Sequence, residues 1–392
     1  MYRLLLAATL VALAGCSGAG TGIPASPAPQ AVARHAASGA EAPGDSASAL
    51  PGDSASALPG AQLACPPSST LGVASCTLAI NITIAPNGNP QAPLGQIAGY
   101  HPTDLQTAYA LPLSRGGVVA IVDAYDDATA ESDLAVYRAA FSLPSCTSAN
   151  GCFRKLGESG ANTLPAPNAA WSQEIALDLD MVSAGCPACT IVLVEANSSS
   201  IDDLGAAVDV AAAQAPAAIS NSYYASEWSN EQNEDVHYRH PGIALTASAG
   251  DAGTPSYPAV SPFVTAVGGT SLHASAGSFS ETAWSYGGQG CSAYVAAPRW
   301  QRGPCTSRAA VDVAAVADPQ TGVAFFCTTS GGWLVAGGTS VGAPLLAAAY
   351  ALSGNPAAPG FSYQHPSAFH DVPPTGIDLV TGLGSPKGTS GL

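Results

Sequence analysis

The chain has 392 residues, of which 47% are hydrophobic and only 10% are charged. This length and composition allow a large buried core in one or two domains. Lys and Arg number 11 against 27 Asp and Glu, which gives a formal net charge of -16. Such an acidic chain argues against nucleic acid as a partner, and against anionic lipid bound through a basic face.

The N-terminus has the pattern of an export signal. A single arginine precedes an apolar run over residues 4–13, and small residues follow. This run is too short to span a bilayer, so it predicts a secretory signal. Residues 13–16, Leu-Ala-Gly-Cys, resemble the bacterial lipoprotein signal box, in which the cysteine is acylated. We expect a lipoprotein-type signal over residues 1–16, export, and membrane contact only through a lipid on Cys16; an ordinary secretory signal without acylation is the alternative.

Two further segments precede the main body of the chain. Residues 17–62 are rich in Ala, Ser, Pro and Gly, and the octapeptide Pro-Gly-Asp-Ser-Ala-Ser-Ala-Leu occurs twice, at 43–50 and 51–58. This composition predicts a disordered tether. Residues 63–98 form a short N-terminal segment with a strand-like run at 78–84, and the sequence assigns it no role.

From residue 99 onward, apolar strands alternate with amphipathic helices. This alternation predicts an α/β fold in which a parallel sheet has helices on both faces, as a single domain over residues 99–392. Functional sites in such sheets gather at the carboxyl ends of the strands, where we expect Asp123, Asp251 and the turn before Ser340. The predicted strands are 117–123, 190–194, 217–220, 243–248 and 264–267, and the predicted helices are 128–143, 174–184, 201–213, 340–352 and one that ends over 236–240.

Ser340 follows Gly-Gly-Thr at the start of a predicted helix and is a candidate nucleophile, provided that the chain supplies a base. The match to G-x-S-x-G does not complete an α/β-hydrolase triad, because no acid lies between Ser340 and His370 and no histidine follows Asp371. A subtilisin-like triad could use Asp123, but no histidine sits in a suitable turn between Asp123 and Ser340. The histidines at 237 and 240 lie in a polar stretch that predicts an exposed surface.

Carboxylates are the remaining candidates for the base. Glu174 and Asp178 are four residues apart, which places them on one face of the predicted helix. Asp251 lies in the glycine-rich turn Ser-Ala-Gly-Asp-Ala-Gly at the end of an apolar segment. Each of these acids also has a structural interpretation. Glu174 and Asp178, with Asp180, could form the solvated face of an amphipathic helix. Asp251 could be an ordinary turn residue, and Asp123 a structural acid at a strand end.

In this order and spacing, the motifs resemble those of the sedolisins, or serine-carboxyl peptidases, which share the subtilisin fold. The resemblance runs from about residue 99 to about 386. Its motifs are Gly-Tyr-His-Pro-Thr-Asp-Leu-Gln-Thr-Ala-Tyr from Gly99, Glu174-x-x-x-Asp178, the turn around Asp251, residues 257–270, Arg308-x-x-x-Asp312, Gly-Gly-Thr-Ser340-x-x-x-Pro344 and residues 381–386.

The resemblance implies that Ser340 is the nucleophile and Glu174 the base that takes its proton. Asp178 would hydrogen-bond to Glu174, and Asp251 would stabilise the oxyanion alongside the Ser340 N–H. Adjacent carboxylates share a proton, and Asp251 can donate only when protonated, so we expect an acidic pH optimum. The prediction is an exported, monomeric acid endopeptidase that acts on proteins or peptides. The alternatives are a catalytically silent surface lipoprotein that binds peptides or partners, and a tripeptidyl-type exopeptidase.

The resemblance also implies one calcium ion near the C-terminus, held by Asp371, Val372, Gly376 and Asp378. Two carboxylates with backbone carbonyls are oxygen ligands of the kind that Ca²⁺ takes. The loop between the two halves is short here, so a carbonyl that a glycine gives in the family falls on Pro374. The family is made with a large folded propeptide, whereas only residues 17–98 lie between the predicted signal and the predicted domain.

Nine of the ten cysteines follow the predicted signal. In an exported protein, close spacing favours local disulfides. Cys186-Pro-Ala-Cys189 lacks the context of a redox or zinc motif, so we interpret it as a structural disulfide too. The predicted pairs are 65–76, 146–152, 186–189 and 291–305, which leaves Cys327 without a partner.

Overall fold

The structure is a computed structural model that describes residues 58–113 and 115–392, all of which fall within one compact unit. The predicted signal, Cys16 and most of the predicted tether lie outside the described residues. The strand β1 (Ala61–Leu63) begins inside the range 17–62 that the sequence predicts as tether, and Leu58 is already buried. The packed part of the chain therefore begins before residue 62.

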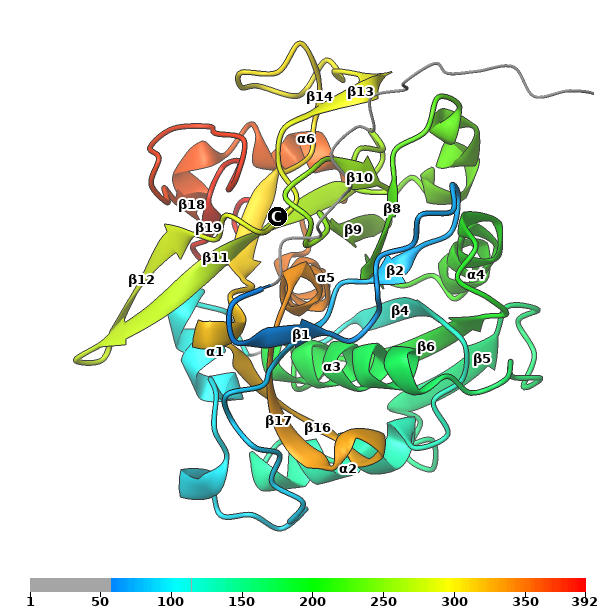
Figure 1. Ribbon diagram of the computed structural model, residues 1–392, viewed down its shortest axis with the longest axis vertical. Helices are drawn as coiled ribbons and strands as arrows, with labels where there is room; N and C mark the ends of the chain where they lie inside the picture. Colours follow the sequence, from blue (N-terminus) through cyan, green and yellow to red (C-terminus); the bar gives the residue numbers. More distant parts are fainter. Residues whose placement is uncertain (1–57, 114) are drawn as a thin grey trace, which may run out of the picture. The chain divides into compact units, whose positions relative to one another are not determined.

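A large, mostly parallel sheet forms the centre of the described body (Figure 1). Its order is β12-β11-β9-β7-β4-β6-β5, with β15 paired to β11. Only β12 runs antiparallel to its neighbour. The strands are β4 (Val118–Ala124), β5 (Phe153–Gly157), β6 (Thr190–Ala196), β7 (Ala218–Asn221), β9 (Ala244–Ser248), β11 (Thr265–Ser275), β12 (Ser278–Ala283) and β15 (Val313–Val316).

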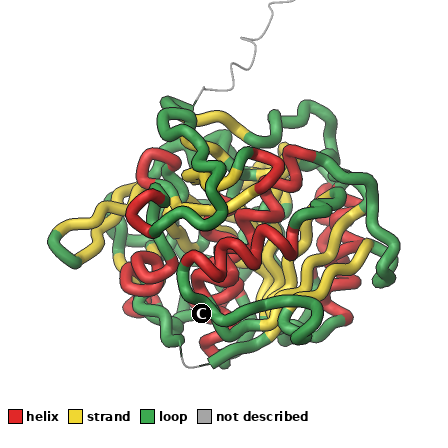
Figure 2. The backbone as a smooth tube through the Cα atoms, turned by 90° about the horizontal axis from the view of Figure 1, so that it is seen from below, coloured by secondary structure: helices red, strands yellow, loops and turns green. Residues whose placement is uncertain are grey.

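Helices pack against this sheet, and Figure 2 shows them in red around the yellow strands. The helices α3 and α5 contact each other, and α4 packs against β4 and β6. Gly185 lets α3 approach α5 closely, because a Cβ there would lie only 2.8 Å from the Cβ of Ala348. The helices are α1 (Pro102–Ala108), α2 (Ala130–Ala140), α3 (Ala169–Gly185), α4 (Ile201–Ala213), α5 (Thr339–Ser353) and α6 (Pro359–Ser362).

The sequence pattern explains these elements. Strands β4 and β6 read as continuous Val-rich and Ile-rich runs and are buried almost throughout, as parallel strands covered on both faces should be. Helix α3 begins at Ala169 rather than at the predicted 174, because the Asn168 side chain caps the backbone N–H groups of Ala170 and Trp171. The helix predicted to end over 236–240 is a 3₁₀ helix, Glu231–Tyr238.

Two small sheets tie the N-terminal segment to the body. One has the order β1-β3-β17-β16 and the other β10-β8-β2. Figure 1 shows the segment in blue, with β2 next to β8. Two further pairs are β13 with β14 and β18 with β19. These strands are β2 (Ser75–Cys76), β3 (Ala79–Asn81), β8 (Tyr223–Ser226), β10 (Ser256–Tyr257), β13 (Cys291–Ala296), β14 (Ser307–Ala309), β16 (Val323–Cys327), β17 (Gly332–Gly337), β18 (Phe369–His370) and β19 (Ser385–Pro386).

All four predicted disulfides are present, and they join the pairs 65–76, 146–152, 186–189 and 291–305. Cys327 is a free, buried thiol. The structure confirms both predictions, including the structural reading of Cys186 and Cys189.

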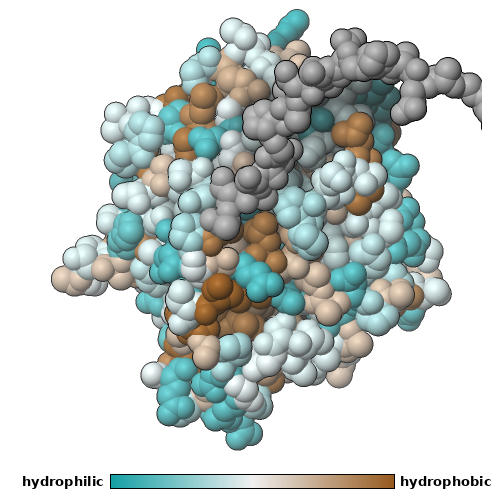
Figure 3. Space-filling model, viewed as in Figure 1, coloured by the Kyte–Doolittle hydropathy of each residue, from teal (hydrophilic) through white to brown (hydrophobic). Residues whose placement is uncertain are grey.

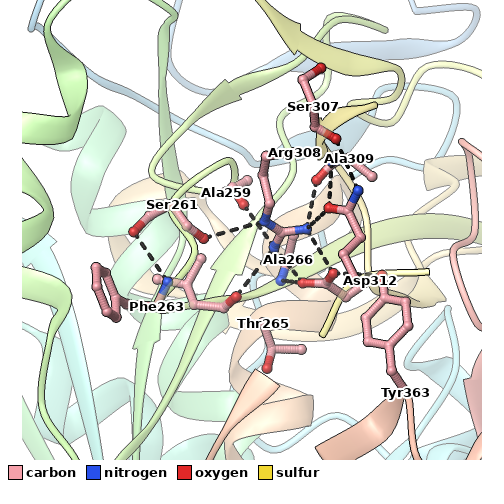
Figure 4. A network of polar contacts seen from close by, with 12 residues as sticks. Ala259, Ser261, Phe263, Thr265, Ala266, Ser307, Arg308, Ala309, Asp312 and Tyr363 are labelled. Carbon is pink, nitrogen blue, oxygen red and sulfur yellow. Dashed lines mark hydrogen bonds and ion pairs between the residues drawn. The ribbon is translucent and has the colours of Figure 1, made fainter. Parts of the chain in front are cut away.

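Arg308 of β14 and Asp312 form a buried ion pair (Figure 4). Arg308 and Asp312 are fully buried, and Arg308 Nη2 lies 2.6 Å from Asp312 Oδ2. The guanidinium also donates to the carbonyls of Ala309 and Val264, and the Tyr363 hydroxyl donates to Asp312 Oδ1 at 2.8 Å. These bonds make the ion pair structural, since its donors and acceptors are directed at each other, at backbone or at the Tyr363 hydroxyl.

The surface is mixed in character. On the face drawn in Figure 3, polar side chains predominate, with apolar patches near its middle. Within the described part of the chain, no helix combines the length and the hydropathy needed to cross a membrane.

Candidate active site

The turn into α5 places Ser340 at the first turn of a long buried helix. Strand β17 ends at Gly337, and Gly338 then adopts a φ of 96°, in the left-handed region that favours glycine. A Cβ at Gly338 would overlap the carbonyl oxygen of Thr77 and lie 2.7 Å from Asp251 Oδ2. Ser340 is fully buried and lies at the N-terminal, positive end of the helix dipole.

The Ser340 hydroxyl contacts the chain's own N-terminal segment. Its Oγ donates a hydrogen bond of 2.6 Å to the carbonyl oxygen of Thr77, which lies between β2 and β3. No sequence signal marks this contact, because a backbone carbonyl carries no residue identity.

Helix α3 carries the two candidate carboxylates into the core. Glu174 and Asp178 are fully buried, and Asp180 is 1% exposed. The alternative of a solvated helix face is therefore wrong. Asp178 Oδ1 accepts a hydrogen bond of 2.8 Å from the Ser222 hydroxyl, just after β7. Among the described residues, neither carboxyl oxygen of Glu174 has a hydrogen-bond partner that satisfies it.

Burial and mutual repulsion control the protonation of these groups. Burial raises the pKa of Glu174 well above its usual value, and the charges of Asp178 and Asp123 raise it further. The Ser340 hydroxyl lowers the same pKa. Burial also raises the pKa of Asp123, at the end of β4, and Asp178 is the next cause. Three carboxyls thus form one buried cluster that favours shared protons over full ionisation.

Asp251 lies on the other side of the turn before Ser340. It follows β9, is only 7% exposed, and its Oδ1 accepts bonds of 2.9 and 3.0 Å from the backbone N–H and the hydroxyl of Thr339. Burial raises the pKa of Asp251 to about 7, and the bonds from Thr339 oppose the shift. Oδ1 is therefore an acceptor, whereas Oδ2 has no hydrogen-bond partner among the described residues.

The sheet explains why residues far apart in the sequence meet. Strands β4, β7 and β9 are parallel, so their carboxyl ends lie at the same end of the sheet. Asp123 lies near the carboxyl end of β4, and Ser222 and Asp251 follow the ends of β7 and β9. His237 and His240 pair with Asp209 of α4. Ser222 and Thr339, which position Asp178 and Asp251, were not predicted from sequence.

The predicted calcium ligands lie in a separate loop after β18. Gly376 donates its N–H to Asp371 Oδ1 at 2.9 Å, and Val372 is buried. Asp378 Oδ1 accepts the N–H groups of Val380 and Thr381, and its Oδ2 accepts the Thr381 hydroxyl at 2.6 Å. The donor types suit Ca²⁺, but backbone groups of the loop already use both carboxylates. Within the described residues, no three side chains of Asp, Glu, His or Cys form a metal cluster.

Models of known protein families give no match to this chain. Among curated proteins, kumamolisin from Bacillus sp. (strain MN-32), of the sedolisin family, is 29% identical to it over 357 residues, covering 74% of this chain. That match spans 62% of kumamolisin, which is less than two thirds of its length.

Solved structures give the fold and a second relative. Pseudomonas sedolisin, a serine-carboxyl proteinase complexed with two molecules of pseudo-iodotyrostatin, has a TM-score of 0.64 and 25% identity, covering 75% of this chain and 96% of sedolisin. The S41 psychrophilic protease is similar in fold, with a TM-score of 0.50 and 16% identity over 72% of this chain and 96% of that one. The predicted subtilisin-like α/β fold is confirmed. In sequence the chain is similar to kumamolisin, and in sequence and fold it is similar to Pseudomonas sedolisin.

Proposed function

We propose that this chain is an exported serine-carboxyl endopeptidase that hydrolyses peptide bonds at acidic pH. The observation that carries the proposal is that the buried Ser340 is grouped with the buried carboxyls of Glu174 and Asp251. The Ser340 hydroxyl lowers the raised pKa of Glu174, and Asp251 contacts the turn before Ser340 through the Thr339 N–H. A weak nucleophile beside a base, with a donor at the opposite side, is the arrangement that acyl transfer requires.

In the proposed reaction, Ser340 Oγ attacks the peptide carbonyl carbon while Glu174 takes the hydroxyl proton. As it does so, Glu174 passes the proton that it shares with Asp178 to Asp178, whose carboxyl the Ser222 hydroxyl holds in place. The oxyanion is stabilised by the Ser340 N–H and by the proton on Asp251 Oδ2. Glu174 then protonates the amine as the peptide C–N bond breaks, and water attacks the acyl-enzyme by the reverse of these proton transfers.

The proposed export has independent support in the disulfides. Four disulfides in one chain are typical of an oxidising compartment and rare in a reducing cytosol. Acylation of Cys16 remains a proposal; mass spectrometry of the membrane fraction tests it, with Cys16→Ser expected to move the protein to the soluble fraction.

Hydrolysis of an unfolded protein from about pH 3 to pH 8 tests the peptidase. We expect acid-optimal cleavage that Ser340→Ala and Glu174→Gln each reduce by about 10⁴-fold or more. Gln keeps the size of Glu174 but cannot take a proton, so it separates the base from mere packing. Product lengths decide between the endopeptidase and the exopeptidase, because an exopeptidase releases short peptides from one end only. Unchanged cleavage in either variant would contradict the mechanism.

We also propose that Ca²⁺ binds the loop of Asp371 and Asp378, as an aid to stability. Its carboxylates would have to exchange backbone hydrogen bonds for the ion, so affinity should be modest. Thermal unfolding with added Ca²⁺ and with a chelator measures this. A rise of the Tm in calcium that Asp378→Asn abolishes supports the site; no difference between the two conditions counts against it.

A further inference from the structure

The residues before β3 show how an extended peptide fits the site. Ser75 and Cys76 pair antiparallel with β8, and the Thr77 N–H donates to the Ser222 carbonyl at 3.3 Å. The Thr77 carbonyl oxygen accepts the Ser340 hydroxyl at 2.6 Å. Pairing with the edge of a strand is a common mode of peptide recognition, and here it brings a backbone carbonyl to the candidate nucleophile. Thr77 thus occupies the position of the acyl-side residue, by which we mean the substrate residue whose carbonyl carbon Ser340 attacks.

The side chain of Thr77 reaches the end of a strand in the central sheet. Its Oγ1 donates a hydrogen bond of 2.9 Å to Ser248 Oγ, at the carboxyl end of β9. Thr77 and Ser248 are both fully buried. Because buried side chains pack at high density, the space around the Thr77 side chain matches threonine in size. We call this space, with Ser248 at its end, the acyl-side subsite.

The other contacts of Ser248 make its hydroxyl an acceptor toward this subsite. Ser248 Oγ lies 3.5 Å from the carbonyl oxygen of Asn221 and 3.4 Å from that of Tyr223, and it can only donate to these oxygens. A serine hydroxyl has one proton and two acceptor lone pairs, so its lone pairs remain for a donor. The Thr77 hydroxyl is that donor. An apolar side chain of the same size would leave a buried oxygen without its donor, which is costly.

The turn that follows Ser248 is held by tight contacts. A Cβ at Gly250 would lie 3.1 Å from Ser256 Oγ and 3.3 Å from Tyr224 Cγ. The Ser256 hydroxyl also donates to the Ala249 carbonyl at 2.8 Å. A larger side chain that pushed this turn aside would break these contacts. The subsite is therefore selective by size as well as by polarity.

We propose that Ser248 is the specificity-determining residue for the acyl-side position, and that the enzyme cleaves preferentially after threonine or serine. This inference rests on the proposed peptidase function and goes beyond it by naming the substrate class. The substrate hydroxyl donates to Ser248 Oγ while the substrate carbonyl meets Ser340. Large residues are disfavoured by their size, and valine or alanine by the missing donor.

Two peptides that differ only at the acyl-side residue, threonine or valine, test this in the wild type at acidic pH. Valine has nearly the shape of threonine, so the ratio of the two kcat/KM values isolates the hydroxyl. We expect a ratio of about ten in favour of threonine. A third peptide with phenylalanine there should be cleaved at least about tenfold less well than the threonine peptide. In the digest of an unfolded protein, mass spectrometry should find threonine and serine enriched before the cleaved bonds.

Two variants assign the preference to one hydroxyl. Ser248→Ala removes the acceptor, so the ratio of threonine to valine should fall to about one or below. The matched control is Ser256→Ala, which removes a buried hydroxyl that bonds to Ala249 rather than to Thr77. It should keep the ratio near ten, whatever it does to the overall rate. Because both peptides are measured in the same variant, partial unfolding cancels from the ratio.

Equal cleavage of the threonine and valine peptides by the wild type would overturn the inference and leave the peptidase intact. A ratio that Ser248→Ala leaves near ten would also overturn it, because another group would then recognise the hydroxyl. So would a ratio that falls equally in Ser256→Ala, since general loosening would explain it. Absence of cleavage of every peptide and of the unfolded protein would contradict the proposed function itself, and the inference would fall with it.

Discussion

Asp251 and the pair of Glu174 and Asp178 are all buried, but the hydrogen bonds around them differ. Thr339 gives Asp251 two donors on one oxygen and leaves the other oxygen directed at the turn before Ser340. The pair is joined by a third buried carboxyl, Asp123, whose charge also raises the pKa of Glu174. Under the proposed mechanism, these environments suit Asp251 to donate a proton and the pair of Glu174 and Asp178 to receive one.

The proposed role of Asp251 predicts a change in the pH profile. Asp251 is a donor only below its pKa of about 7, so activity should fall as the pH rises through about 7. In Asp251→Asn, the amide donates at every pH, so the alkaline limb of the kcat profile should move upward. Asp251→Ala, which has no donor, should lose about 10²–10³-fold in kcat. An alkaline limb that is identical in Asp251→Asn and the wild type would rule out this role.

The two helices that carry the site, α3 and α5, are buried along almost their whole length. Helix α3 has apolar side chains on most of its surface and is buried through almost its whole length, which is the pattern of a core helix rather than a surface one. Its three acids are therefore desolvated together. Helix α5 is equally buried and begins immediately after the glycine turn that exposes the Ser340 N–H to the site.

That turn makes Gly338 sensitive to substitution. Gly338→Ala would place a Cβ into the Thr77 carbonyl and force a left-handed φ, so we expect a loss of about 3 kcal/mol or more in the free energy of unfolding. Gly277→Ala is the matched control: its φ is 84°, but no atom lies within 4 Å of the added Cβ. That change should cost only about 1–2 kcal/mol. Urea unfolding measures both, and equal losses would show that the contact with Thr77 is unimportant.

The buried ion pair of β14 gives a second test at this scale. Arg308→Met removes the only side-chain cation on Asp312 that the structure shows within the described residues, and should destabilise the fold by about 3–5 kcal/mol. Arg308→Met/Asp312→Leu, which leaves no buried charge, should recover most of that loss. Unfolding free energies of the two variants and the wild type form the measurement. A double variant that is as unstable as the single one would mean that packing around Arg308, rather than charge, is decisive.

At the scale of the whole molecule, the buried acids link folding to pH. Burial raises the pKa of Asp251 to about 7 and those of Glu195 and Glu231 to about 8, and it also raises those of Glu174, Asp178 and Asp123. A raised pKa means that the folded state binds more protons than the unfolded state. Each such acid therefore stabilises the fold fully at a pH below its pKa in the unfolded chain, near 4. This stabilisation is lost as the pH rises through its pKa in the folded state.

We therefore expect the protein to be more stable in acid than in mild alkali. The free energy of unfolding of the Ser340→Ala variant, which cannot digest itself under the proposed mechanism, should fall by about 2 kcal/mol or more between pH 4 and pH 8. Adding Asp251→Asn should reduce that slope, because one titrating group is lost. Stability that rises over this interval would contradict the raised pKa values.

Local sequence determined much of this protein. Apolar runs and helical periodicity predicted the central strands and the α/β class, because each strand and helix must bury its own apolar face. Close spacing predicted the four disulfides, since a short loop holds its two cysteines near each other. The spacing of Glu174 and Asp178 and the glycine turn before Ser340 are equally local, and so they could be recognised as a candidate site.

Only the tertiary structure decided the rest. Whether the acids of α3 are solvated or buried depends on what packs against that helix, and its pattern alone allowed both. The parallel sheet decides that Ser222 meets Asp178, and the fold decides that Thr339 meets Asp251. Residues 63–98 are the clearest case: the sequence predicted no role for them, because the contact of Thr77 with Ser340 is made by a backbone carbonyl. Backbone pairing depends on the position of a strand in space and leaves almost no trace in residue identity.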